Sequence, residues 1–246
     1  MPCLVAVIPS RMAATRLPGK PLLARTGKPL LQHVYERVLA TDGLFDRVVI
    51  ATCDEPIERA ALRFGAEVVR TRSDHATGTD RVAEAVALLG ADACVNVQGD
   101  EPEMEGVVLR AVVEALRLGS APMATAASPW PAHLDPASPS EVKVVVDLAG
   151  RALYFSRSVI PYGAAGGARL LRHIGVYAYE AGFLSRFASL PRTPMEAAES
   201  LEQLRALEHG HAITVATVPY GGRSIDTPEE YEAFVARASG AGGRAR

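Results

Sequence analysis

The sequence predicts an α/β fold built on a mainly parallel sheet, and three observations lead to this prediction. Short apolar runs alternate with segments of helical period over the first hundred residues, an order typical of parallel sheets covered by helices. Polar loops follow two of these runs, where ligands of such sheets bind. After about residue 120 the pattern changes to short strands joined by polar turns, which indicates an antiparallel region.

The first half of the chain supplies seven expected elements. Buried strands are expected at Cys3 to Ile8, Arg47 to Thr52, Glu67 to Val69 and Ala93 to Val97. Helices are expected at Leu30 to Leu39, Pro56 to Phe64 and Thr79 to Leu88. The loops Pro9 to Pro21 and Gln98 to Pro102 both leave strands at the carboxyl edge, so we expect them to face one site.

The second half is expected to be mixed. Strand-like segments are Pro122 to Ser128, Val142 to Val146, Ala152 to Ser156 and Ile213 to Val218. Helices are expected at Glu196 to Glu208 and at Pro228 to Ala238, the latter capped by Thr227. Gly163 to Gly167 reads as a mobile loop and 239–246 as a flexible tail. We expect one domain over 1–238.

Composition excludes several classes. The 246 residues suit one large α/β domain or two small ones, and the net charge of −2 disfavours a nucleic-acid binder. The three cysteines lie in apolar runs without disulfide or zinc-ligand spacing, so reduced core thiols are expected. No signal segment and no apolar run of about 20 residues is visible, which predicts a cytoplasmic protein without a membrane partner.

The first loop is basic. No acid precedes Glu36, whereas five cations do. They are Arg11, Arg16, Lys20, Arg25 and Lys28. Such a local positive field suits a polyphosphate, although a solvated basic loop is the alternative. Neither the Walker phosphate loop nor the dinucleotide fingerprint is present, so a different phosphate cradle is required.

Two acidic positions are candidate metal ligands. Asp100 and Glu101 follow a glycine directly after a buried strand, where a carboxylate can hold Mg²⁺, although an ordinary acidic turn is the alternative. Asp226 precedes the last helix, and helix capping is the commoner role for an aspartate there.

Two polar clusters complete the candidate sites. The first surrounds the start of the third helix, where Asp74 or Thr77 is either a cap or a ligand contact and backbone groups can read a base. His75 has no partner at zinc spacing. The second contains Arg157 and His173, whose hydrogen-bond donors suit an acidic, hydroxylated ligand. The alternative is that the cations form surface salt bridges and the histidine is buried. Covalent acyl chemistry has no support, because no nucleophile elbow is present.

Eight segments occur in the order of a known family. They are IPSRMAATRLPGKPL, RSDHATGTDRV, VNVQGDEP, VKVVVD, ALYFSRSVIPY, LRHIGVYAY, LEQLR and IDTPEE. From about residue 4 to 235, the chain closely resembles the 3-deoxy-manno-octulosonate cytidylyltransferases, or CMP-Kdo synthetases. The resemblance implies Mg²⁺-dependent transfer of CMP from CTP to the anomeric 2-hydroxyl of 3-deoxy-manno-octulosonate (Kdo) for lipopolysaccharide. It implies a Rossmann-like nucleotide-diphospho-sugar transferase fold, with an antiparallel homodimerisation and sugar-site region at about 120–180.

The resemblance also implies roles for individual residues. Arg11 and Lys20 would hold the triphosphate and, with Asp100, carry catalysis. Asp100 and Asp226 would coordinate Mg²⁺. The cytidine would be surrounded by Pro9, Ser10, Asp74, Thr77 and Gly78. The sugar would be lined by Gln98, Arg157, His173, Tyr177, Glu199 and Gln203.

The chain departs from the family pattern at a few positions; the two single-residue changes remove no charge, whereas the shortened loop is expected to affect which sugar is accepted or how the site closes. Ser10 stands where alanine is usual, Ala14 where serine is common, and Gly163 to Ala168 is shorter than in relatives. Two alternatives stay open. One is a cytidylyltransferase for another acidic sugar, such as 8-amino-Kdo or a sialic acid. The other is a non-catalytic nucleotide-binding regulator, against which the intact Lys20, Asp100 and Asp226 argue.

Overall fold

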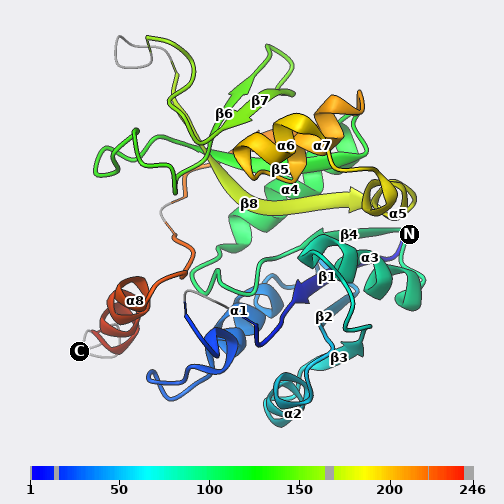
Figure 1. Ribbon diagram of the computed structural model, residues 1–246. Helices are drawn as coiled ribbons and strands as arrows, with labels where there is room; N and C mark the ends of the chain where they lie inside the picture. The colour runs from blue at the N-terminus through cyan, green and yellow to red at the C-terminus, as the bar shows by residue number, and fades with distance from the viewer. Residues whose placement is uncertain (1, 14–16, 164–168, 221, 241–246) are drawn as a thin grey trace. The chain divides into compact units, whose positions relative to one another are not determined.

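Residues 2–13, 17–163, 169–220 and 222–240 are described by the structure, a computed structural model (Figure 1). The chain divides into two compact units. The first unit comprises Cys3–Gly90, Asn96–Gly106 and Gly222–Arg246. The second unit comprises Met1–Pro2, Ala91–Val95 and Val107–Gly221. Because the chain passes repeatedly from one unit to the other, neither is a continuous segment, and the expectation of one domain over 1–238 stays a prediction.

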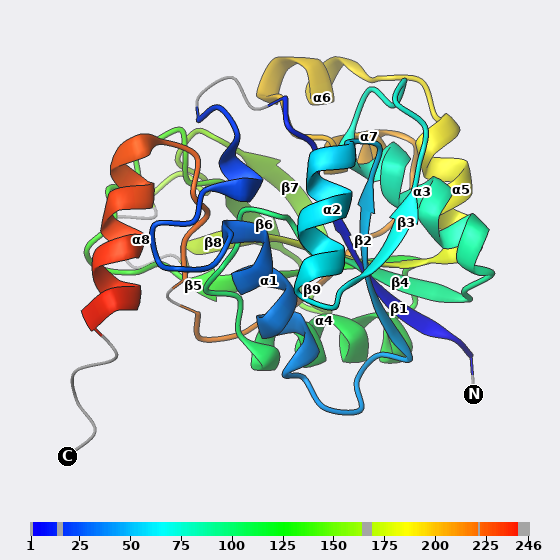
Figure 2. The same ribbon diagram turned by 90° about the horizontal axis from the view of Figure 1, so that it is seen from below.

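The first unit is built on three parallel strands. They are β1 (Leu4–Pro9), β2 (Arg47–Thr52) and β3 (Glu67–Arg70), with β2 pairing both neighbours. The strands contact α1 (Leu30–Leu39), α2 (Glu55–Arg63) and α3 (Gly78–Leu89). Figure 2 shows α1 and α2 to the left of β2 and β3 in that view. Polar loops therefore leave the carboxyl ends of β1 and β2 at one edge, as expected.

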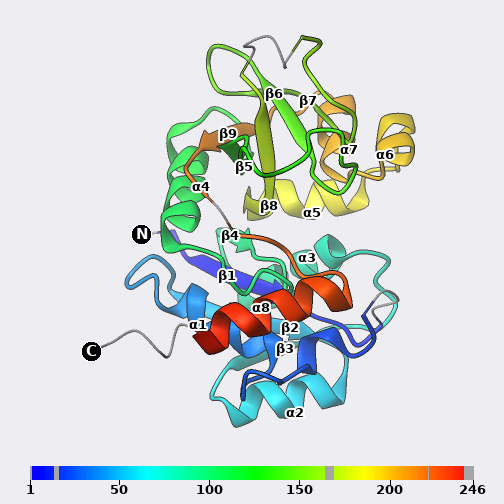
Figure 3. The same cartoon turned by 90° about the vertical axis from the view of Figure 1, so that its left-hand side faces the viewer.

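The last helix of the chain packs against the first loop. A buried apolar cluster joins Leu17 and Leu30 to Ile225, Tyr231 and Phe234. The latter two belong to α8 (Pro228–Gly240), which Figure 3 shows beside the N-terminal segments. Burial of these side chains stabilises the contact by about 1.5–3 kcal/mol each. It also brings the residues just before α8 to the edge of the sheet where β1 ends.

The second unit is mixed. Its strand β5 (Met123–Pro129) runs antiparallel to β8 (Leu171–Glu180) and parallel to β9 (Thr214–Thr217). A smaller ladder pairs β6 (Lys143–Val146) antiparallel with β7 (Ala152–Ser156) and, at one position, with β8. The strand β4 (Ala93–Asn96) lies almost wholly in this unit. The change of pattern after residue 120 therefore does mark an antiparallel region, although β5 keeps one parallel neighbour.

Helices of the second unit depart most from expectation. The helix predicted at Glu196 to Glu208 is wrong, because it is two helices, α6 (Pro194–Glu199) and α7 (Gln203–Glu208). Ser200 between them is left-handed, with φ of 53°. The sequence pattern also failed to predict α4 (Gly106–Leu118), β8 and α5 (Ala181–Ser189).

The remaining expectations follow the structure closely. Strand and helix boundaries in the first unit agree within one residue, except that α8 ends at Gly240, two residues beyond the predicted Ala238. Thr227 caps α8 by accepting the Glu230 N–H. No disulfide joins the three cysteines, all of which lie among the described residues. Only Cys94 is a buried core thiol, and burial raises its pKa, whereas Cys3 and Cys53 are partly buried. Residues 164–168 and 241–246, which hold most of the predicted loop and tail, lie outside the described residues. Across the described ranges, no helix is long and apolar enough to cross a membrane.

Candidate functional site

A cavity of about 320 Å³ opens in the first unit. It is lined by the loop after β1, the start of α3, the turn after β4 and the residue before Thr227. The two loops expected to face one site therefore do so. The predicted site residues that line this cavity are Pro9, Ser10, Arg11, Lys20, Thr77, Gly78, Gln98, Asp100 and Asp226.

Lys20 is placed by the local geometry of its loop. Gly19 has a φ of 68°, a left-handed conformation that glycine adopts without a Cβ clash. The short 3-10 helix η1 (Lys20–Leu22) begins directly after it, and Pro21 is buried. The glycine and proline of the PGKP segment thus turn the Lys20 side chain inward, where it is 14% exposed.

The Lys20 ammonium group is surrounded by oxygen. It lies 2.8 Å from Asp100 Oδ2, 3.0 Å from Asp226 Oδ1 and 2.9 Å from the Ile225 carbonyl. Burial lowers the pKa of Lys20, but the charges of Asp100 and Asp226 and their hydrogen bonds outweigh it and leave that pKa above its usual 10.5. Lys20 is therefore a fixed cation at neutral pH.

The two carboxylates fit a hard divalent cation. Both are partly exposed, at 26% for Asp100 and 31% for Asp226, and both converge on one positive group, the Lys20 ammonium. Mg²⁺ is commonly held by one or two carboxylates together with water and substrate phosphates. Among the described residues, no cluster of three or more potential metal ligands is present. The pair thus fits a metal that arrives with a phosphate substrate.

Glycine allows the turn after β4 to approach the first loop. A Cβ at Gly99 would lie 3.1 Å from the Pro9 carbonyl oxygen, which is closer than most side-chain contacts. Nearby, Ser10 is 6% exposed and its hydroxyl oxygen has no hydrogen-bond partner in the described part of the chain. A buried polar atom of this kind requires a partner, so a ligand in the cavity would supply one.

The start of α3 forms another wall of the cavity. Thr77 caps the helix, because its hydroxyl accepts the Asp80 N–H at 3.1 Å while Asp80 accepts the Thr77 N–H at 3.0 Å. The capping reading of Thr77 is therefore correct, and Thr77 also lines the cavity. Asp74 does not line it; its exposed carboxylate lies 3.3 Å from Arg72.

Arg81 and His75 line the cavity but were not assigned to the site individually. Arg81 is 4% exposed and donates to the Thr71 hydroxyl, the Arg72 carbonyl and the Cys53 sulfur. His75 hydrogen-bonds to Glu84. Helical spacing could have predicted the place of Arg81, because it follows the Thr77 cap by one helical turn and lies on the same face of α3.

In the second unit, Arg157 and Glu199 are tied together. The Glu199 carboxylate accepts the Ser156 hydroxyl at 2.6 Å and the Arg157 N–H at 2.9 Å. The Arg157 guanidinium donates to the carbonyls of Glu199 and Pro139 at 2.8 Å each, and to Ser200 at 3.3 Å. Arg157 therefore fixes the segment between α6 and α7 through backbone oxygens.

His173 and Tyr177 lie along β8 in an aromatic row. The His173 ring packs on Phe155 at 5.0 Å and on Tyr177 at 5.5 Å between centroids. Its Nε2 lies 3.0 Å from the Thr125 hydroxyl oxygen. Desolvation, with a smaller contribution from Arg172, lowers the pKa of His173 to about 3, and burial raises that of Tyr177. The imidazole is therefore neutral near pH 7.

Gln203 is the second predicted residue that has an unsatisfied polar atom. Its side chain begins α7 and is 4% exposed, yet its Nε2 has no hydrogen-bond partner among the described residues. Gln98, in the first unit, donates to Asn96 Oδ1 at 3.3 Å. The buried Gln203 amide, which has no partner among the described residues, is therefore a candidate donor to a ligand oxygen.

Known proteins resemble this chain over nearly its whole length. Residues 5–213 match the family model described as cytidylyltransferase. The 3-deoxy-manno-octulosonate cytidylyltransferase of Syntrophobacter fumaroxidans is 50% identical, covering 94% of this chain and 95% of the relative. That of Halorhodospira halophila is 47% identical, covering 96% and 97%.

Solved structures agree. A CMP:2-keto-3-deoxy-manno-octonic acid synthetase complexed with CTP is 42% identical, with a TM-score of 0.92 over 97% of this chain and 99% of that one. A cytidylyltransferase from Leptospira borgpetersenii, 19% identical, has a TM-score of 0.63 over 97% and 87%. The second likeness concerns the fold alone. Together they confirm the predicted α/β nucleotidyltransferase fold.

Proposed function

The chain belongs to the 3-deoxy-manno-octulosonate cytidylyltransferase family, and we propose that it transfers CMP from CTP to the anomeric 2-hydroxyl of Kdo. The products are CMP-Kdo, for lipopolysaccharide biosynthesis, and diphosphate. The geometric observation that carries this function is the meeting of Lys20, Asp100 and Asp226 in one cavity beside the basic loop. The cavity provides positive side chains that can bind a triphosphate, and it also provides carboxylates that can bind the metal ion of that triphosphate.

The reaction is a nucleotidyl transfer. The sugar hydroxyl oxygen forms a bond to the α-phosphorus of CTP, the bond from that phosphorus to the bridging oxygen breaks, and diphosphate leaves. The hydroxyl proton is released. Such a transfer requires in-line placement and neutralisation of phosphate charge more than covalent participation by the protein.

Residues of the first unit are proposed to hold the nucleotide. Arg11 and Lys20 bind the triphosphate and stabilise the leaving diphosphate. The raised pKa of Lys20 supports this role, because the side chain stays charged throughout the physiological range. The cytidine lies among Pro9, Ser10, Asp74, Thr77 and Gly78. The unpartnered Ser10 hydroxyl supports this placement. Asp74 does not line the cavity and lends the placement no support.

Asp100 and Asp226 are proposed to hold Mg²⁺. When bound there, the ion supplies Lewis-acid neutralisation of phosphate charge. The convergence of both carboxylates on the Lys20 ammonium supports the assignment, since it brings the two acids to one positive centre. These acids also orient Lys20, so the three side chains act as one group.

Kdo is proposed to bind through Gln98, Arg157, His173, Tyr177, Glu199 and Gln203. The unpartnered Gln203 amide is a donor for a sugar hydroxyl or carboxylate. His173, neutral near pH 7, offers hydrogen bonds without a charge. Arg157 contributes by fixing the 199–200 backbone and by its positive charge near an acidic sugar.

Diphosphate release tests the function. The enzyme is incubated with CTP and a panel of acidic sugars, with Mg²⁺ or with a chelator. Release with Kdo and Mg²⁺, and little with 8-amino-Kdo or a sialic acid, is the expected result. Preference for another sugar would replace the substrate. No release with any sugar, despite CTP binding, would favour the regulator.

We further propose a cytoplasmic homodimer. The region proposed for dimerisation carries the exposed apolar side chains Leu148, Leu153 and Tyr162, at 110%, 60% and 104% exposure. Such side chains suit an interface between copies. Light scattering should give twice the chain mass, and Leu153→Lys should shift it toward the monomer. Cell fractionation tests the proposed cytoplasmic location, a compartment in which CTP is available.

A further inference from the structure

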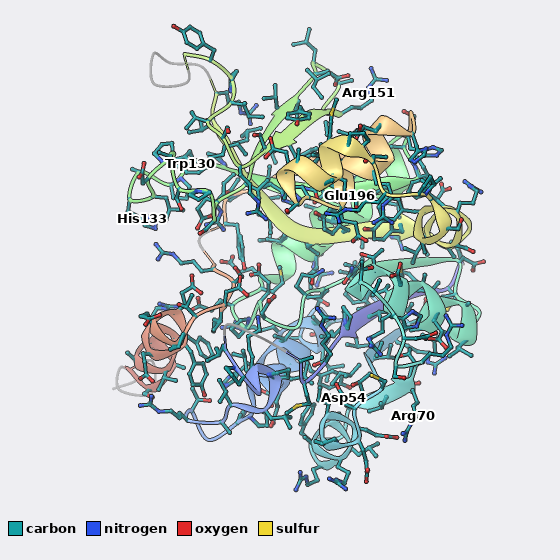
Figure 4. The ribbon with its side chains drawn as sticks, in the orientation of Figure 1. Asp54, Arg70, Trp130, His133, Arg151 and Glu196 are labelled. Atoms are coloured by element: carbon teal, nitrogen blue, oxygen red, sulfur yellow. The ribbon has the colours of Figure 1, made fainter. Side chains whose placement is uncertain are left out.

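The Asp54 carboxylate is tied to the first loop. Its Oδ2 accepts the Met12 N–H at 2.7 Å, across 42 positions of sequence. Asp54 stands at the N-cap position of α2, where Figure 4 labels it, yet its side chain makes no capping hydrogen bond. An aspartate at this position commonly caps the helix. Here the carboxylate is used for a long-range contact instead.

This contact fixes the backbone beside Arg11. The Ser10 N–H donates to the Ala51 carbonyl at 2.9 Å, and the Met12 N–H donates to Asp54. Ala51 is the next-to-last residue of β2 and Asp54 lies two residues after the strand, so the amides on either side of Arg11 are anchored near the same strand end. Arg11 itself is exposed, lines the cavity and makes no ion pair with a described residue.

A carboxylate at this place has an electrostatic cost for an anion site. Asp54 brings negative charge close to a loop whose side chains are proposed to bind a triphosphate, which opposes binding by Coulomb repulsion. A charged acceptor, however, makes a shorter and stronger hydrogen bond to an amide than a neutral one. Ordering a long arginine side chain for a ligand costs entropy, and a fixed backbone lowers that cost.

We propose that Asp54 is a positioning residue, which holds the loop so that Arg11 points at the triphosphate of CTP. The proposal rests on the proposed function for the identity of the anion. Asp54 does not touch the nucleotide. Its effect passes through the Met12 amide to Arg11.

Three variants at and beside position 54 test the proposal. Asp54→Ser keeps a residue that favours a helix start but is too short to reach Met12, and it should raise the KM for CTP about tenfold with kcat changed less than about twofold. Asp54→Asn keeps an acceptor oxygen and should stay near wild type. Glu55→Gln, which removes the neighbouring exposed acid, should leave the KM unchanged.

A double-mutant cycle with Arg11 separates positioning from a general structural effect. In an Arg11→Ala background, Asp54→Ser should raise the KM by less than about twofold, because the two residues act through one contact. Full additivity of the two changes would overturn the proposal. The proposal would also be overturned if Asp54→Ser had the wild-type KM for CTP although its Met12 amide had lost its protection from hydrogen exchange.

Amide hydrogen exchange supplies the readout that does not depend on turnover. The Met12 amide should exchange slowly in the wild type and in Asp54→Asn, and quickly in Asp54→Ser, at an unchanged thermal midpoint. Slow exchange in Asp54→Ser would contradict the anchoring contact. If the wild type released no diphosphate with any sugar, the proposed function would be contradicted instead. The double-mutant cycle would then use the Kd for CTP, measured by calorimetry, in place of the KM.

Discussion

Lys20 donates a 2.8 Å hydrogen bond to the Asp100 carboxylate, and the two residues are 80 positions apart. The same ammonium reaches Asp226 across 206 positions. Three loops that are distant in sequence are therefore joined at one charged centre. The charges there are arranged as a cation between two acids, so a change to any of the three alters the electrostatics felt by the other two.

Asp100→Asn should abolish most turnover while the fold survives. The amide keeps the volume of the carboxylate but removes the charge that the proposed Mg²⁺ ion would require. We expect kcat to fall by at least about 100-fold. Diphosphate release with saturating Mg²⁺ measures the loss, and an unchanged thermal midpoint shows that the protein is intact. A wild-type rate would remove Asp100 from the site.

Arg157→Ala should act on the sugar. The guanidinium holds the carbonyls of Pro139, Glu199 and Ser200, so its loss frees the segment that carries Glu199 and approaches Gln203. We expect the KM for Kdo to rise about tenfold or more, with a smaller effect on the KM for CTP. Steady-state kinetics with each substrate varied in turn provide the measurement. Equal changes in both KM values would contradict a role confined to the sugar.

His173 should make stability depend on pH in a defined direction. Its pKa is about 3 in the folded protein and near 6.5 when exposed, so the unfolded state binds more protons below pH 6.5. Stability should therefore fall as the pH is lowered from 6.5 toward 3, by up to about 1.4 kcal/mol per pH unit.

Urea unfolding of wild type and His173→Gln at pH 7 and pH 5 measures this dependence. The wild type should lose more stability over that interval than the variant. The matched control is His133→Gln, which removes an exposed imidazole and should follow the wild type. Parallel pH profiles for wild type and His173→Gln would mean that His173 is not held neutral by its surroundings.

A buried ion pair joins α6 to α7. Arg205 donates to both oxygens of Glu196 at 2.8 and 2.6 Å, and both side chains are less than 10% exposed, at 8% and 7%. Figure 4 labels Glu196 on α6. Burial alone raises the pKa of Glu196, but the bonds and charge of Arg205 leave it below 4.5. Arg205→Met leaves a buried carboxylate and should cost about 3–5 kcal/mol of the free energy of unfolding.

The sign of the pH dependence follows from the lowered pKa of Glu196. The stabilisation is complete above about pH 4.5 and is lost as the pH falls through the lower pKa of the folded state. The difference between wild type and Arg205→Met should therefore shrink below pH 4.5. Adding Glu196→Met to Arg205→Met should restore part of the stability, and no restoration would show that Glu196 was not the cause.

Local patterns predicted the first unit well. The alternation of apolar runs and helical segments gives its strands and helices, and the carboxyl-edge rule places the loop of Lys20 beside that of Asp100. Asp226 differs, because a residue before a helix looks like a cap. Its partner Lys20 is 206 positions away, and only the packing of α8 on the first loop brings them together.

The second unit shows why the rest was not predictable. The segment from Glu196 to Glu208 has a continuous helical pattern, but the chain turns at Ser200, where Arg157 holds the carbonyls of Glu199 and Ser200. The partner that interrupts the helix is therefore absent from the local sequence. Strand β8 was likewise missed, and its partner β5 is distant in sequence and pairs with it irregularly, with a register shift between Thr125 and Ala126.

Phosphorus NMR of a single reaction shows whether CMP is transferred to Kdo with Asp100 in the site. CTP, Kdo and Mg²⁺ are mixed with the enzyme, and the spectrum is followed beside an identical sample containing Asp100→Asn. The three CTP signals should disappear, while a phosphodiester signal for CMP-Kdo and a diphosphate signal grow in equal amounts, and the Asp100→Asn sample should stay nearly unchanged. Release of phosphate or diphosphate without a phosphodiester, or equal conversion by the variant, would contradict this expectation.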